Sequence, residues 1–83
     1  MATNPVSNNI RTLRFFHDEM SQKALADKVG VTRQTILAIE NEKYSPSLEL
    51  AFRIAHVFGT SLEEVFTYNP DNDPGLNLSG KKK

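Results

Sequence analysis

A run of polar and small side chains between positions 32 and 41 has the residue types best suited to contact a ligand directly. Ile36 and Ile39 are three residues apart and share one face of a helix, at about 100° per residue. The outward direction is then occupied by Gln34, Leu37, Ala38 and Asn41, with Arg33 on the flank. An ordinary solvated helix face usually has pairs of glutamate and lysine instead. This nearly uncharged face is therefore a candidate binding surface.

These side chains match the edges of DNA bases. Gln can pair bidentately with adenine and Arg with guanine in a major groove, and apolar side chains can contact a thymine methyl group. The pattern therefore predicts a recognition helix over Thr32–Asn41. The expected base-contacting residues are Arg33, Gln34, Leu37 and Ala38. The alternative is that Arg33 and Gln34 are only surface residues of a small helical domain, because short helix pairs are common.

Two short helices around a tight turn would position this face. Leu25, Ala26 and Val29 form the apolar stripe of a first helix, and Gly30 follows where a left-handed C-cap belongs. Thr32 then offers a hydroxyl N-cap to the second helix. Two short helices joined by a short turn that contains glycine form the helix-turn-helix pattern.

A longer series of motifs extends this pattern from about Asn9 to Phe66. In order along the chain they are Gln22, Leu25-Ala26, Gly30-Val31, Ile36, Ile39-Glu40 and Pro46-Ser47. This series resembles the helix-turn-helix family of Cro, the phage lambda-type repressors and the Xre regulators. The resemblance implies an all-α, five-helix, lambda-repressor-like DNA-binding domain, with the helix-turn-helix at its second and third helices.

Contacts to DNA phosphates are expected at the start of the first of these two helices. Gln22 and Lys23 follow the predicted Ser21 cap, where free backbone N–H groups and the helix dipole favour a phosphate. In the family, the residue that matches Gln22 binds the DNA backbone. Thr32, at the start of the recognition helix, belongs to the same expected phosphate-contacting set.

The loop after the recognition helix is a weaker part of the resemblance. In the family, the matching loop lays an Asn and a basic residue against phosphate, which implies this role for Asn41 and Lys43. The usual residue between them is glycine, whereas this chain has Glu42. Its negative charge lies next to the expected phosphate contact, and its side chain disfavours a positive φ.

The remaining apolar residues predict a first, a fourth and a fifth helix. In the first, Ile10, Leu13 and Phe16 are candidates to face inward. The adjacent Phe15 and Phe16 cannot both point at the same core. Either one is exposed or covered by a partner, or both are accommodated with one partly covered.

The fourth and fifth helices collect more apolar surface than a small monomer readily hides. A homodimer would use this surplus, although closing the monomer core is the alternative. The expected interface residues are Leu50, Val57, Leu62, Val65 and Phe66.

Composition excludes several classes of function. The 83 residues include ten basic and ten acidic ones, so any DNA binding depends on local placement of charge. There is no cysteine for a disulfide framework or a thiolate zinc site. His17 and His56 lie far apart without clustered ligands, so we expect no metal. We also expect neither a cofactor nor an enzyme, because no nucleophile has a nearby base and no glycine-rich phosphate loop occurs.

The chain divides into three predicted parts. Residues 1–7 are expected to be a flexible lead, residues 8–67 the helix-turn-helix domain, and residues 68–83 a disordered polar tail that ends in three lysines. No apolar run approaches the roughly 20 residues that cross a bilayer. The N-terminus also lacks the pattern of a signal peptide. We therefore expect a soluble, cytoplasmic protein without membrane contact.

Two functions from different classes fit these patterns. The first is a sequence-specific double-stranded DNA-binding transcriptional regulator that acts as a homodimer on a two-fold symmetric operator. The alternative is a protein-interaction module of the same fold, such as an antitoxin that binds a toxin or an adaptor to RNA polymerase. The zero net charge and Glu42 favour the alternative modestly.

Overall fold

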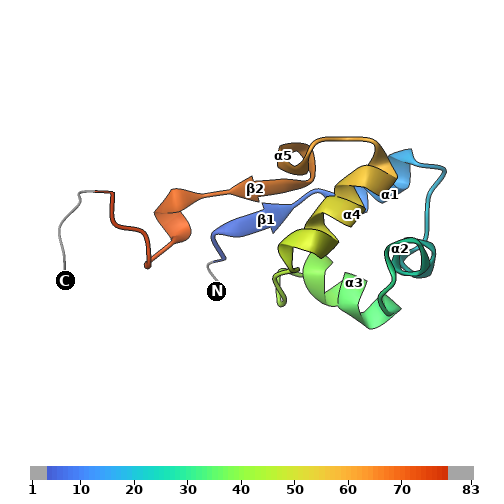
Figure 1. Ribbon diagram of the computed structural model, residues 1–83, viewed down its shortest axis with the longest axis horizontal. Helices are drawn as coiled ribbons and strands as arrows, with labels where there is room; N and C mark the ends of the chain where they lie inside the picture. The colour runs from blue at the N-terminus through green and yellow to red at the C-terminus, as the bar shows by residue number, and fades with distance from the viewer. Residues whose placement is uncertain (1–3, 79–83) are drawn as a thin grey trace.

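In the computed structural model, which describes residues 4–78, five helices surround an apolar core and a strand pair extends from it (Figure 1). The elements are β1 (Val6–Asn8), α1 (Ile10–Phe16), α2 (Gln22–Val29), α3 (Arg33–Glu40), α4 (Leu48–Phe58), α5 (Leu62–Val65), β2 (Phe66–Tyr68) and a 3₁₀ helix (Pro70–Asn72). The three terminal lysines of the expected tail lie outside the described residues. No helix within residues 4–78 is long and apolar enough to span a membrane.

Capping residues set the ends of the central helices. In α2, α3 and α4, the side-chain oxygens of Ser21, Thr32 and Ser47 each accept a hydrogen bond from the backbone N–H three residues further on. Each cap satisfies a donor that would otherwise lack a partner inside the helix. Gly30 and Gly59 follow α2 and α4 with φ of 80° and 67°, a conformation that suits a residue without a side chain.

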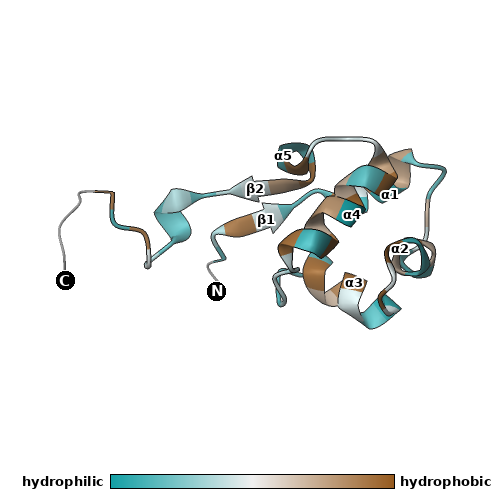
Figure 2. Cartoon of the chain, in the orientation of Figure 1, coloured by the Kyte–Doolittle hydropathy of each residue, from teal (hydrophilic) through white to brown (hydrophobic). Residues whose placement is uncertain are grey.

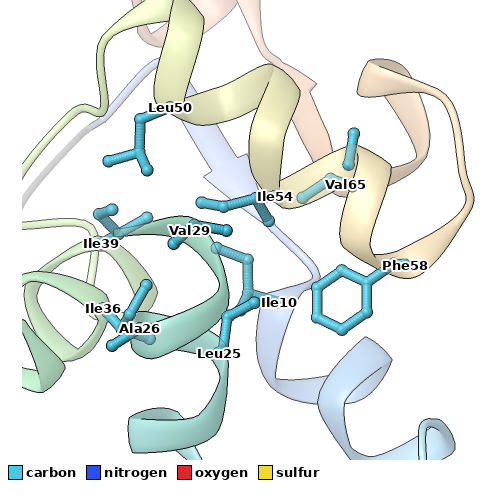
Figure 3. Packing of buried hydrophobic residues seen from close by; sticks show 11 residues of the cluster. Ile10, Leu25, Ala26, Val29, Ile36, Ile39, Leu50, Ile54, Phe58 and Val65 are labelled. Atoms are coloured by element: carbon cyan, nitrogen blue, oxygen red, sulfur yellow. The ribbon is translucent and has the colours of Figure 1, made fainter. Parts of the chain in front are cut away.

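The core receives a fully buried side chain from each of the helices α1 to α5 (Figure 3). Ile10, Leu25, Ile36, Ile54 and Val65, one each from α1 to α5, are all 0% exposed. Burying an aliphatic side chain of this size stabilises a fold by about 1.5 to 3 kcal/mol relative to exposing it. The core therefore holds the helix-turn-helix of α2 and α3 against α1, α4 and α5.

The strand pair corrects the all-α prediction, because the fold is mostly helical with a small antiparallel sheet. Val6 lies opposite Tyr68, and Asn8 lies opposite Phe66. The pairing takes in residues 6 and 7 of the expected flexible lead and residue 68 of the expected tail. Each strand has three residues, too few for a periodic signal, and its partner lies at the other end of the domain.

Beyond β2 the chain forms hydrogen bonds at short range. The Asn69 side chain accepts a bond from the Asp71 N–H at 3.1 Å. The Tyr68 hydroxyl donates to Asp73 Oδ2 at 2.6 Å, and this bond raises the pKa of Tyr68. This segment leads away from the helices (Figure 1). The expected disorder of residues 68–83 stays a prediction.

The end of α1 differs from its predicted pattern. Ile10 is buried and Leu13 partly buried, but Phe15 and Phe16 are 61% and 73% exposed, so neither enters the core. Their rings meet edge to face with centroids 5.4 Å apart. The ring of His17 instead packs against the buried Phe58, with centroids 5.1 Å apart. The expectation that Phe16 faces inward is therefore wrong, since its side chain is exposed and the next ring along the chain, His17, packs against the core residue Phe58.

Candidate nucleic-acid interface

The recognition helix predicted from sequence corresponds to α3 with its cap. Ile36 and Ile39 are 0% and 1% exposed and anchor α3 to the core. Arg33, Gln34 and Leu37 are exposed. Ala38 is partly buried beside them. The four expected base-contacting residues therefore lie together on the side of α3 that is turned away from the core. The start of α3 is hydrophilic and the part that follows is hydrophobic (Figure 2).

Two hollows flank this exposed ridge of α3. The first, of about 310 Å³, is lined by Thr32, Gln34, Thr35, Ala38 and Tyr44. The second, of about 430 Å³, is lined by Asn8, Arg11, Arg14, Gln22, Leu37, Glu40 and Asn41. We call the second one the α1–α3 hollow. It brings residues expected to contact bases and residues expected to contact phosphates to a common surface.

Glu40 is the centre of a polar network at this surface. Its carboxylate accepts bonds from Arg14 Nε at 2.7 Å and Arg14 Nη2 at 3.1 Å. Gln22 Nε2 donates to the same carboxylate at 3.1 Å. The side chains of Arg14 and Glu40 are only 15% and 6% exposed. Such a pair is costly to break, because the remaining charge would lose its partner away from water.

Sequence analysis missed this network, although one signal was present. Glu40 is four residues after the buried Ile36 and therefore lies on a neighbouring part of the same helix face. A carboxylate so close to an inward face needs a cationic partner. Sequence spacing cannot identify Arg14 as that partner, because 26 residues separate Arg14 from Glu40.

Gln22 connects the network to the recognition helix. Its Oε1 accepts a bond from Arg33 Nη1 at 3.4 Å, while one N–H of its amide is used by Glu40. An amide has two N–H donors, so one is left for a phosphate. Arg33 likewise retains further guanidinium N–H groups after this contact.

The other two phosphate-contacting candidates on α2 and α3 already have partners. Lys23, on the first turn of α2, pairs with Asp27 at 3.2 Å, and both side chains are well exposed. An exposed pair of this kind contributes little stability and is easily exchanged for a phosphate. The Thr32 hydroxyl caps α3 and lies 3.1 Å from the Thr35 hydroxyl.

The loop after α3 has the backbone shape that glycine would favour. Glu42 has a φ of 61°, and its carbonyl accepts a bond from the Asn4 side chain at 3.0 Å. Asn41 and Lys43 on either side of it are exposed. The loop thus keeps the conformation expected from the resemblance despite the glutamate, whose carboxylate adds a negative charge there.

A different surface is formed by α4, α5 and β2. Leu48 and Phe52, four residues apart on α4, are 67% and 54% exposed. Leu48, Leu62 and Phe66 line one apolar hollow of about 310 Å³. Phe52, Val57 and Leu62 line a neighbouring one of about 950 Å³. Leu62 joins the two, and we call these five residues the α4 patch.

The α4 patch differs from the interface expected from sequence. Leu50 and Val65 are 6% and 0% exposed and belong to the core, so their side chains offer no surface to a partner. Val57, Leu62 and Phe66 keep partial exposure. Leu50 points from α4 into the core cluster (Figure 3). Leu48 and Phe52, on the same helix, are exposed instead.

Comparisons with known proteins bear on the family to which the chain belongs. A family model described as helix-turn-helix matches residues 17–65. An uncharacterised HTH-type transcriptional regulator of Methanocaldococcus jannaschii is 48% identical over 66 residues, which cover 80% of this chain and 98% of that protein. The cryptic phage CTXphi transcriptional repressor RstR of Vibrio cholerae is 33% identical over 66 residues, which cover 80% of this chain and 59% of the repressor.

A solved structure shows the same fold. The crystal structure of a protein from Bacteroides fragilis superposes with a TM-score of 0.65 at 19% identity, covering 75% of this chain and 98% of that one. Sequence motifs, family match and relatives together identify the chain: it belongs to the Cro and lambda-repressor-like (Xre) family of helix-turn-helix transcriptional regulators.

Proposed function

We propose that this protein is a sequence-specific double-stranded DNA-binding transcriptional regulator that acts as a homodimer on a two-fold symmetric operator. The observation that supports this most is the exposed ridge of α3, which is anchored by Ile36 and Ile39 and braced through Gln22 by the buried Glu40 network. A major groove admits an α-helix, and side chains on the exposed face of that helix then reach the base edges.

The ridge residues have distinct roles in this proposal. Gln34 pairs with an adenine through its amide, and Arg33 pairs with a guanine through its guanidinium. The bond from Arg33 to Gln22 limits the orientations of the arginine before DNA arrives. Leu37 and Ala38 lie against a thymine methyl group, where a polar side chain would contribute less to the binding free energy.

The phosphate contacts surround the ridge and set its register on the duplex. Gln22 uses its remaining N–H together with the free backbone donors at the start of α2. Lys23 exchanges Asp27 for a phosphate. Asn41 and Lys43 contact the backbone beyond the other end of α3. Thr32 belongs to the proposed phosphate-contacting set because it lies just before the first turn of α3, and its hydroxyl also caps that helix.

The homodimer forms through the α4 patch. A two-fold contact places the same surface against itself, so the surface must be complementary to its own copy. The rim of the larger hollow has charges of both signs, Glu49 and Glu63 beside Arg53. Each copy can therefore offer an acidic group to a basic group of the other around the apolar centre. The two α3 helices would then meet half-sites one helical turn apart, about 34 Å.

Selection from a random duplex pool tests the proposal directly. The purified protein is incubated with the pool at two salt concentrations, and bound sequences are read. We expect an enriched motif made of two inverted half-sites spaced by about one helical turn. Absence of enrichment at both salt concentrations would refute sequence-specific binding. A single enriched half-site would refute the dimer and leave the DNA function.

A second function is favoured by one observation. Phe15 and Phe16 are both largely exposed on α1, which contributes no residue to the α4 patch. A protein-interaction module, such as an antitoxin or an adaptor to RNA polymerase, would cover them with its partner. Salt separates the two functions, because the affinity for DNA falls with a log-log slope of about −0.9 per neutralised phosphate, whereas an apolar contact hardly responds.

A further inference from the structure

The two arginines of α1 are used in opposite ways. Arg14 is mostly buried, pairs with Glu40 through two nitrogens and donates a third bond to the Met20 carbonyl at 2.8 Å. Arg11, three residues earlier, is exposed, and within residues 4–78 it forms no ion pair. Its guanidinium is therefore available to an external anion.

Arg11 also determines the charge of the α1–α3 hollow. The hollow is lined by Arg11, Arg14 and Glu40 among others. Arg14 and Glu40 neutralise one another at 2.7 Å, so the net positive charge there is that of Arg11. A guanidinium in such a place suits a phosphate, because its planar fork can donate two parallel hydrogen bonds to two oxygens.

The walls of the hollow indicate which anion would reach Arg11. Gln22, Leu37 and Asn41 also line it, and these residues belong to the proposed DNA-contacting set. A DNA strand that passes from the start of α2 to the end of α3 must cross the mouth of this hollow. The phosphodiester backbone is therefore the negatively charged group that comes close to Arg11.

We propose that Arg11 is a further DNA-backbone contact, a site on α1 that binds one phosphate at the mouth of the α1–α3 hollow. The inference rests on the proposed function, since it requires α3 to lie in a major groove. It adds a third helix to the interface, so that α1 carries one arginine for the fold and one for the DNA.

The test compares the salt dependence of variants that either lose or keep the charge. Affinity for the selected operator and for a random duplex is measured between 50 and 200 mM salt for wild type, Arg11→Gln and Arg11→Lys. Arg11→Gln should make the log-log slope shallower by about 0.9 per protomer, or about 1.8 for the dimer. Both DNAs should lose affinity by the same factor, because a phosphate contact carries no sequence information. Arg11→Lys should restore most of the slope.

A matched control is Lys28→Gln, which removes another exposed cation, from the last turn of α2 at the edge of the larger hollow. Its slope should stay close to that of wild type once the variant is shown to have the same oligomeric state. A wild-type slope for Arg11→Gln, with operator binding intact, would overturn the Arg11 contact alone. Failure of wild type to bind any duplex would overturn both the contact and the proposed function.

Discussion

The surface around Glu40, formed by α3, the start of α2 and Arg14 of α1, and the surface formed by α4, α5 and β2 share one core but differ in the side chains that they bury. On the first side a charged pair is buried, because the Glu40 side chain is only 6% exposed in its ion pair with Arg14. On the second side, large apolar groups are left outward, and Leu48 is 67% exposed. A polar ridge that must meet DNA in one geometry needs a rigid support, whereas an apolar patch needs a partner to cover it.

The energetic consequences of this difference should be unequal. Removing one member of a buried ion pair affects folding itself, because the other charge stays behind without a partner. Removing an exposed apolar side chain leaves the isolated monomer almost unchanged and affects association. Substitutions on the two sides should therefore be separable by measuring unfolding and oligomeric state independently.

The largest effect is expected at the buried pair. Glu40→Ala should lower the free energy of unfolding by about 3 to 5 kcal/mol, because it strands the mostly buried Arg14 and frees Gln22. Urea unfolding followed by circular dichroism measures this. The control is Glu49→Ala, which breaks the exposed pair with Arg53 and should cost at most about 0.5 kcal/mol. Similar losses in the two variants would contradict the contrast between the sides.

The next effect is expected at the α4 patch. Phe52→Asp should weaken the dimer by about 2 kcal/mol or more, because a charge replaces a large apolar group at the contact. Sedimentation equilibrium over a range of concentrations measures the dissociation constant. Phe16→Asp is the matched control, since Phe16 is at least as exposed but lies on α1. If Phe16→Asp abolished the dimer and Phe52→Asp did not, the α4 patch would be refuted as the dimer interface.

An intermediate effect is expected on the ridge of α3. Gln34→Ala should cost about 1 to 3 kcal/mol of operator binding and relax the preference at one base pair, because in the proposed complex the Gln34 amide pairs with a base edge. Repeating the selection and the affinity measurement with the variant tests both parts. Equal losses on operator and random DNA would show that Gln34 does not contact a base.

The smallest effect is expected at the strained loop. Glu42→Gly should raise the free energy of unfolding by about 0.5 kcal/mol, because relief of the positive φ is partly offset by the greater freedom of glycine in the unfolded chain. Glu42→Gln keeps the strain and removes the charge, so it should leave stability unchanged. Both variants should bind DNA more tightly at low salt. If Gln stabilised the protein as much as Gly, the backbone argument would be wrong.

Local chemistry explains which parts of the fold could be predicted. Ser21, Thr32 and Gly30 act within a few residues of themselves, and each stands at the helix end predicted for it. The same holds for Ile36 and Ile39, whose spacing alone determines their common face. The outward residues of α3 follow from that face, although their contacts with DNA stay predictions.

The parts that could not be predicted depend on contacts between distant segments. A helical wheel orders the residues of α4 around its axis, but it does not say how far neighbouring helices cover each edge. Leu50 therefore entered the core while Leu48 and Phe52 stayed outside it. The pairing of Arg14 with Glu40 and of β1 with β2 likewise joins segments that share no local signal.

The strand pair has a consequence for the time course of folding. The pairing of Val6 with Tyr68 closes almost the whole described chain into one loop. The entropy lost on closing this loop must be offset before the pairing stabilises the fold. Contacts between α2 and α3 are local and can form early. Amides of β1 and β2 should then exchange with solvent through brief local openings, while those of α2 and α3 wait for global unfolding. Native-state hydrogen exchange that showed the reverse order would disprove this sequence of events, in which α2 and α3 form before the strand pair closes.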